Sequence, residues 1–160
     1  MKPKRFVLVS FLQPLKPGER FQASDWPLHI TVVSPFETGD PETVRNAIGV
    51  VVESIRAFHV TAGNRALFGP NHDIPVNEIR GSAELSRLHE NLIRALDRQI
   101  TLKNPRYALA GYRPHVTHHH GRQAKPGETI AIQAVALVDR EPDEKDAGVR
   151  RVHSVYPLRR

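Results

Sequence analysis

The chain has 160 residues, which fits one compact domain spanning residues 1–160, and it carries a formal net charge of +6. It contains no cysteine, so disulfides, thiolate metal sites and cysteine nucleophiles are excluded. No apolar run approaches the roughly 20 residues that a membrane-spanning helix needs, and we expect a cytoplasmic protein that does not bind membranes. The positive charge favours anionic partners such as phosphate esters or RNA.

The first part of the chain shows two strand signals and then a helix signal. Residues 6–12 form a short apolar run and residues 28–34 alternate in polarity, so both predict strands. A helix should follow the N-cap Asp40, with Pro41 in its first turn, and end near Ala57. Its apolar residues recur at helical spacing and predict one buried stripe: Val44, Ile48, Val51, Val52 and Ile55.

The second part repeats this order of strands and helix. Residues 58–62 and 73–79 predict strands, with a turn at residues 63–64. A second helix should begin at Ser82 and end before Asn104, with its stripe at Leu85, Leu88, Leu92, Leu96 and Ile100. Further strands are predicted at 115–119, 128–139 and 149–156, with a charged turn at 140–148. This order predicts an α+β fold in which helices cover one side of antiparallel sheets.

One short pattern, histidine-aliphatic-threonine, occurs twice, at residues 29–31 and 115–117. Each copy lies in a predicted strand shortly after a proline. Side chains at i and i+2 of a strand share a face, so the histidine and threonine of each copy point the same way. Polar side chains buried without partners on an apolar strand are destabilising, so we expect this face to line a wet cleft.

These residue types suit phosphodiester chemistry. Cleavage takes a proton from the attacking oxygen and gives one to the leaving oxygen. With ordinary pKa values near 6.5, one of His29 and His115 can be the neutral base while the other is the protonated acid. The hydroxyls of Thr31 and Thr117 would donate to the non-bridging oxygens as negative charge builds there. The sequence does not assign the two histidine roles, and the scheme needs no metal and no cofactor.

The segments H-I-T-V at 29–32 and H-V-T-H at 115–118 resemble the paired H-x-T-x motif of the two-histidine (2H) phosphoesterases. That group includes the bacterial 2′-5′ RNA ligase-like (LigT-like) proteins and the cyclic phosphodiesterases. The resemblance implies a bilobal α+β fold, in which two antiparallel sheets related by a pseudo-twofold axis carry helices on the outside and face a central cleft. It also implies a metal-independent enzyme, here expected as a monomer, that acts on 2′,3′-cyclic or 2′-5′ phosphodiesters of a nucleotide or RNA.

Four residues beside the motifs are candidates for substrate binding: Trp26, Tyr112, Arg113 and His119. The two aromatic rings could stack on a base, and the arginine could contact phosphate. In a continued strand, His119 would share the cleft face with His115. Core packing of the aromatic rings and simple solvent exposure of the arginine are the alternative interpretations.

Two other functions stay open. A nucleotide- or RNA-binding module could keep the cleft without catalysing a reaction. A metal-dependent hydrolase could use the histidines at 118–120 with His115, since imidazole is a common zinc ligand. Strand alternation, however, turns His118 and His120 away from His115, so we predict no metal site. LigT-like proteins often carry an arginine soon after the second motif, where this chain has the histidine run before Arg122, so the substrate stays open.

Overall fold

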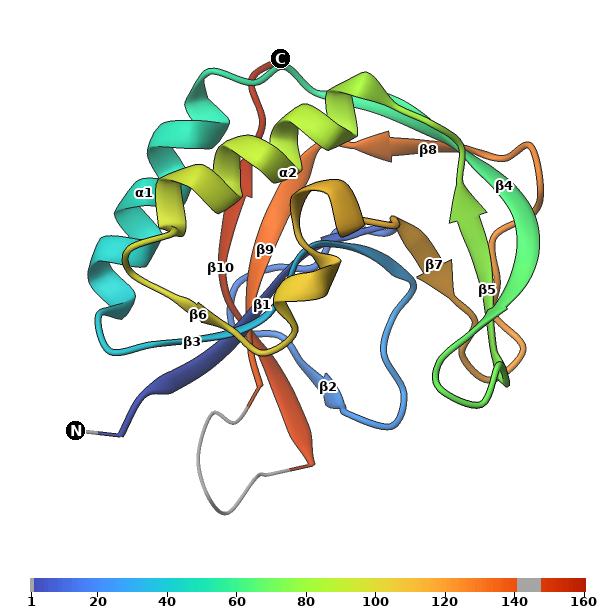
Figure 1. Cartoon of the computed structure of the whole chain (residues 1–160), viewed down its shortest axis with the longest axis horizontal. Coiled ribbons are helices and arrows are strands. Elements are labelled where there is room, and N and C mark those ends of the chain that lie inside the picture. The colour runs from blue at the N-terminus through green and yellow to red at the C-terminus, as the bar shows by residue number, and fades with distance from the viewer. Residues whose placement is uncertain (1, 141–147) are drawn as a thin grey trace.

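The computed structural model describes residues 2–140 and 148–160, so most of the predicted turn at 140–148 lies outside the described residues. In chain order the elements are β1 (Lys4–Phe11), β2 (Arg20–Gln22), β3 (His29–Thr38), α1 (Pro41–Glu53), β4 (Phe58–Phe68), β5 (Ile74–Ile79), α2 (Ala83–Leu96), β6 (Thr101–Leu102), the 3-10 helices η1 (Pro105–Tyr107) and η2 (Leu109–Gly111), β7 (His115–Thr117), β8 (Thr129–Ile132), β9 (Ala134–Asp139) and β10 (Val149–Pro157). Figure 1 shows their arrangement. No helix in the described part of the chain is long and apolar enough to cross a membrane.

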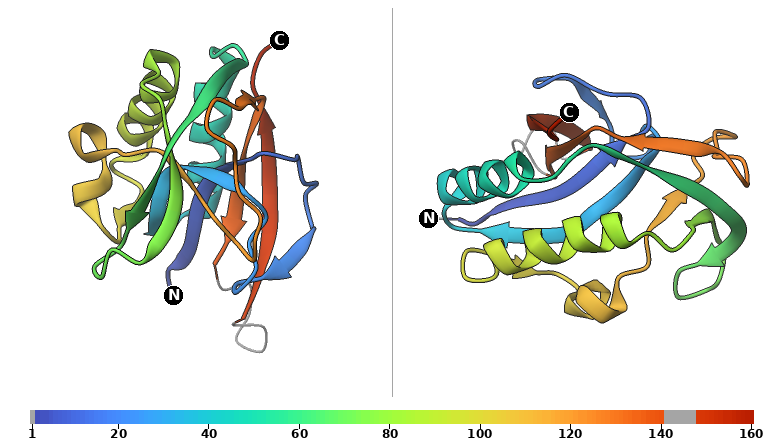
Figure 2. Two further views of the ribbon diagram at one scale, coloured as in Figure 1. Left: turned by 90° about the vertical axis from the view of Figure 1, so that its right-hand side faces the viewer. Right: turned by 90° about the horizontal axis from the view of Figure 1, so that it is seen from above.

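The strands form a curved antiparallel sheet with a narrow waist. Their order is β2-β10-β9-β1-β3-β7-β5-β4-β8, and β6 pairs with β3. At the waist β3 and β7 meet through the single pair Ile30–Val116, which divides the sheet into two lobes. The sheet curls round, as Figure 2 shows, and Gln133 alone separates the last strand of one lobe, β8, from β9 of the other. The predicted α+β fold with antiparallel lobes is confirmed.

Both helices lie on one side of the sheet and pack against each other (Figures 1 and 2). Each begins at its predicted N-cap: the Asp40 carboxylate accepts from Thr43 N at 3.2 Å, and Ser82 Oγ accepts from Leu85 N at 3.1 Å. The predicted stripes fill the main core with side chains from the sheet, among them Phe6, Leu8, Ile30, Val32, Val44, Ile48, Leu88, Leu92 and Val116. A smaller apolar cluster covers the other face of β1, β9 and β10: Val7, Val9, Phe11, Ala136, Val138 and Val152.

Several predicted boundaries are wrong, and the pairing explains why. β4 does not turn at residues 63–64 but continues to Phe68, because a bulge between Ala62 and Arg65 absorbs the extra residues. Glycine is needed at this bulge, since a Cβ at Gly63 would lie 2.9 Å from the Glu78 carbonyl oxygen. The strand expected at 128–139 breaks at Gln133 into β8 and β9, α1 ends before Ala57, and the short β2 was not predicted.

A buried histidine on α2 connects the helix layer to β3 and to the segment that precedes β7. His89 donates from Nδ1 to Val32 O at 2.7 Å, and its Nε2 accepts from Leu109 N at 2.9 Å. Its ring stacks on Tyr112, with centroids 3.9 Å apart and planes 8° apart. The Tyr112 hydroxyl donates to Thr31 O at 2.7 Å. Burial lowers the pKa of His89, in keeping with a neutral ring that uses one nitrogen as donor and the other as acceptor.

We predict that His89→Leu lowers the free energy of unfolding by at least about 2 kcal/mol. The substitution leaves Val32 O and Leu109 N without partners, and each buried unpaired group costs about 1–3 kcal/mol. Urea unfolding measures the change. The matched control is His59→Leu on the exposed face of β4, which should change stability by less than about 0.5 kcal/mol. Equal effects of the two substitutions would contradict this role of His89.

Candidate active site

The waist of the sheet brings the two motifs together. Since β3 and β7 are antiparallel and Ile30 pairs with Val116, the histidine of each motif lies opposite the threonine of the other. Ile30 and Val116 are fully buried in the helix-side core, so the motif side chains point to the opposite face. The four residues on that face are His29, Thr31, His115 and Thr117. Opposite Cβ atoms in such a ladder lie about 4.5–5.5 Å apart and diagonal residues about 7–8 Å apart, so the two imidazoles are diagonal neighbours.

The two catalytic candidates make the same hydrogen bond. His29 donates from Nδ1 to the carbonyl oxygen of Pro27, and His115 donates from Nδ1 to that of Arg113, both at 2.8 Å. Each bond reaches back two residues. A carbonyl oxygen can only accept, so Nδ1 must carry the hydrogen, and Nε2 of each neutral ring is left as an acceptor. In the described part of the chain, the hydroxyls of Thr31 and Thr117 form no hydrogen bond with other protein groups.

Burial sets the charge state of both imidazoles. It lowers the pKa of His29 from 6.5 to about 4, against the opposing effect of the bond to Pro27, and His119 and His115 lower it further. Burial also lowers the pKa of His115, while its bond to the Arg113 carbonyl raises it. Both rings are therefore neutral near pH 7 in the free protein. An anion bound between them would favour protonation of one ring.

We predict that His29 makes the fold acid-sensitive. Its pKa is about 4 when folded and 6.5 when unfolded, so the unfolded chain takes up the proton first as the pH falls from 6.5 towards 4. The free energy of unfolding therefore decreases across this window, and His29→Gln should remove part of that decrease. Urea unfolding between pH 4 and 7 measures it, with the exposed His72→Gln as control. Parallel curves for wild type and His29→Gln would show that the shift is absent.

Each histidine is flanked by an aromatic ring. The Trp26 ring lies 4.7 Å from that of His29, and the Phe68 ring lies 4.8 Å from that of His115. The guanidinium of Arg113 lies over the Phe68 ring at 4.5 Å and donates to Glu78 at 2.8 Å. Trp26 therefore lies beside His29, and Arg113 lies over the ring that flanks His115. Substrate binding by either residue stays a prediction.

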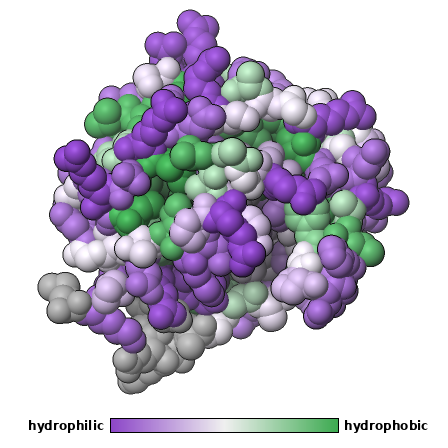
Figure 3. Space-filling view, in the orientation of Figure 1, coloured by the Kyte–Doolittle hydropathy of each residue, from purple (hydrophilic) through white to green (hydrophobic). Residues whose placement is uncertain are grey.

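Phe68 was missed because the predicted strand stopped at Ala62. The short apolar run of residues 66–68 beyond the glycine was the available signal. The neighbouring hairpin residues Leu67 and Ile74 are 58% and 42% exposed, and Figure 3 shows hydrophobic atoms on the side where β4 and β5 lie. The surface of the β4–β5 hairpin is therefore partly apolar.

A loop-to-loop contact places a third histidine at the site. The His119 ring is stacked on that of His29, with centroids 6.3 Å apart. The strand predicted at 115–119 ends at Thr117, so His119 reaches this position from a loop. Arg122 connects the loop after β7 to the segment before β3, because it donates to the Asp25 carboxylate, to Trp26 O at 3.2 Å and to His119 O at 3.3 Å. Sequence reasoning missed this role of Asp25 and Arg122, since only the folded chain brings them together.

The structure places the side chains of Tyr112 and His118 away from the motif face. Tyr112 does not lie on the motif face: its ring packs on His89 against the helix-side core, which is the alternative interpretation of this residue, and its hydroxyl supports β3. His118 hydrogen-bonds to Asn77 Oδ1 at 2.7 Å, away from His115. Within residues 2–140 and 148–160, no group of three or more histidine, aspartate or glutamate side chains is placed to hold a metal ion.

The family model described as the 2′-5′ RNA ligase superfamily matches residues 8–159. The chain belongs to this superfamily. The resemblance to LigT-like proteins seen in the motifs is thereby confirmed. No sequence among the curated proteins matches this chain.

Solved structures of low sequence identity share the fold of this superfamily member. E. coli LigT complexed with 3′-AMP matches with a TM-score of 0.64 and 13% identity, covering 99% of this chain and 100% of that one. A crystal structure titled as a phosphoesterase matches with a TM-score of 0.63 and 15% identity, with the same coverage. The protein TT0787 of Thermus thermophilus matches with a TM-score of 0.61 and 18% identity, covering 97% of this chain and 98% of that one.

Proposed function

We propose that this chain is a metal-independent phosphodiesterase that acts on 2′,3′-cyclic or 2′-5′ phosphodiesters of a nucleotide or RNA end. His29 and His115 are its acid and base. The observation that carries the proposal is their matched hydrogen bonding, which leaves Nε2 of both rings free beside each other's threonine. The E. coli LigT structures complexed with 3′-AMP, ATP and NADP+ support a nucleotide as the ligand here.

In the proposed reaction, one histidine takes up a proton and the other gives one up. In hydrolysis of a 2′,3′-cyclic phosphate, Nε2 of the neutral histidine takes a proton from water while the water oxygen bonds to phosphorus. The bond from phosphorus to one ribose oxygen breaks, and Nε2–H of the other histidine protonates that oxygen. The two rings have then exchanged charge states, and the reverse reaction exchanges their roles. The bound phosphate anion supplies the field that keeps one ring protonated despite its burial.

The neighbouring groups have separate tasks in this proposal. The hydroxyls of Thr31 and Thr117 donate to the non-bridging oxygens as charge develops on them. The rings of Trp26 and Phe68 hold the imidazoles in place, and their free surface can contact the sugar or a base. His119 binds the substrate beside His29. Arg113, which is already paired with Glu78, contributes long-range attraction of the anion.

Turnover of 2′,3′-cyclic nucleotides and 2′-5′ dinucleotides in the presence of a chelator tests the proposal. We expect wild-type activity, and a fall in kcat of at least about 10²-fold in both His29→Ala and His115→Ala, since each removes a positioned proton transfer. The exposed His72→Ala is the control and should keep full activity. Activity that disappears in chelator and returns with zinc or manganese would contradict the metal-independent mechanism. Nucleotide binding without turnover would favour a binding module.

A further inference from the structure

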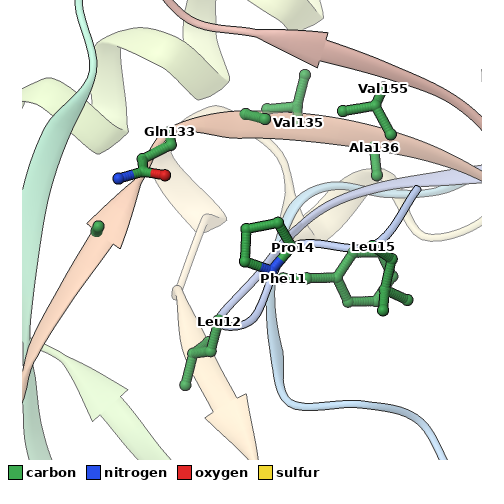
Figure 4. Close-up of a pocket in the computed structure, with 10 residues that line it drawn as sticks. Phe11, Leu12, Pro14, Leu15, Gln133, Val135, Ala136 and Val155 are labelled. Atoms are coloured by element: carbon green, nitrogen blue, oxygen red, sulfur yellow. The ribbon is translucent and has the colours of Figure 1, made fainter. Parts of the chain in front are cut away.

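The His29 ring contacts rings from three separate segments of the chain. The ring of Phe11 meets it edge to face with centroids 6.1 Å apart, and the rings of Trp26 and His119 lie 4.7 Å and 6.3 Å away. Phe11 is fixed by the sheet, because it pairs in register with His29, and it packs with Leu15 in the smaller apolar cluster (Figure 4). Trp26 and His119 lie outside the strands, between β2 and β3 and after β7. Their position on His29 therefore depends on what holds these two loops.

A tight turn follows β7. His119 and Arg122 exchange two backbone hydrogen bonds, of 3.0 Å and 2.9 Å, and the two residues between them have positive φ: 50° at His120 and 80° at Gly121. These values are those of a type I′ turn, whose left-handed backbone suits glycine and is unfavourable for histidine. A histidine keeps such a conformation only where other contacts fix it. This turn has such contacts with the segment before β3.

Arg122 binds that segment with its guanidinium. It donates to the Asp25 carboxylate, to Trp26 O at 3.2 Å and, within the turn, to His119 O at 3.3 Å. An isolated ion pair whose side chains are 46% and 52% exposed would contribute little. Here the planar guanidinium bonds to three acceptors at once, two of them on the other loop, which favours one fixed geometry.

His120 adds a second connection between the loops. It donates from Nε2 to Ser24 O at 2.9 Å, since a carbonyl oxygen can only accept, and this Nε2 lies 3.8 Å from Asp25 Oδ1. We call the contacts of His120 and Arg122 with residues 24–26 the Arg122 clamp. Each side of the clamp is adjacent in the chain to a ring that contacts His29, because residue 25 precedes the tryptophan and residue 120 follows His119.

We propose that Arg122 and Asp25 are positioning residues of the active site: they hold the two loops together so that the rings of Trp26 and His119 stay on His29 and exclude water from it. The inference rests on the proposed function for its effect on catalysis, because there His29 transfers a proton at the phosphate. Its effect on the ring itself is measured without any substrate.

The exclusion of water has a measurable consequence for His29. Burial is the main cause that lowers the pKa of His29 to about 4, and the titratable groups that lower it further are His119 and His115. The other rings in contact, those of Phe11 and Trp26, carry no charge. Water that reaches the imidazole would raise this pKa towards its ordinary value of 6.5.

NMR titration of the His29 ring in Asp25→Asn and Arg122→Gln tests the clamp. We expect the pKa of His29 to rise from about 4 to above about 5 in both variants. A direct charge effect would have opposite signs, since loss of a carboxylate lowers the pKa of an imidazole and loss of a guanidinium raises it. The matched control is Glu37→Gln, which removes a similarly exposed ion pair with Arg5 at the other end of β3 and should leave the pKa unchanged.

Trp26 is the only tryptophan of the chain, so its fluorescence gives an independent measurement. Acrylamide should quench it more strongly in Asp25→Asn and in Arg122→Gln than in wild type or Glu37→Gln. The double variant should resemble the single ones, because all three lose the same contact. Quenching that equals the wild-type value in the single variants would overturn the clamp.

The pH profile of kcat/KM for a 2′,3′-cyclic nucleotide connects the clamp to catalysis. Whether His29 acts as base or as acid, the limb of the profile that it sets should move to higher pH in Asp25→Asn and Arg122→Gln. We expect a displacement of at least about one pH unit, and none in Glu37→Gln. A raised pKa of His29 without this displacement would overturn the role of the clamp in catalysis.

The clamp and the proposed function fail in different ways. If the pKa of His29 stays at its wild-type value, or moves in opposite directions in the two variants, the clamp is overturned while the two-histidine phosphodiesterase stands. If wild type hydrolyses no cyclic phosphate, the proposed function is overturned. The titration and the quenching then still decide whether Arg122 and Asp25 keep water from His29.

Discussion

The pairing of Ile30 with Val116 is the contact on which the site depends. It is the one pair that joins β3 to β7, and therefore the one that joins the two lobes through their motif strands. Both side chains are buried in the helix-side core. The free energy of burying them stabilises the register in which β3 pairs with β7. A slip of one residue would turn a histidine and a threonine towards the helices. The core thus determines which face carries the polar groups.

The same burial that fixes the fold also sets the protonation of the two motif imidazoles. Desolvation lowers the pKa of both His29 and His115, so the free protein holds two neutral bases next to each other. The Nδ1 bonds to backbone carbonyls orient the rings, and the aromatic neighbours limit their movement. The arrangement is close to twofold, since each ring has an aromatic partner and a carbonyl two residues upstream. Near pH 7, an anion bound between the rings would favour a form with one ring protonated and the other neutral.

Local patterns in the sequence predict the features that depend on residues close together in the chain. The helix starts at Asp40 and Ser82 follow from capping chemistry within three residues, and the shared faces of the motifs follow from strand alternation. What was missed depends on contacts between distant residues: His89 bonds to Val32 over 57 positions, and Tyr112 to Thr31 over 81. The position of the Tyr112 ring could not be predicted for the same reason, because it depends on stacking against His89 of α2.

Nitrogen-detected NMR of the histidine rings is the most direct test of the central claim, that His29 and His115 present Nε2 to one phosphate. At pH 7 in the free protein, both rings should be neutral with the hydrogen on Nδ1. Addition of inorganic phosphate should shift the Nε2 resonances of both rings together, and His29→Gln should weaken the response of His115. A hydrogen on Nε2 of either neutral ring, or a response from only one of them, would contradict a shared phosphate site.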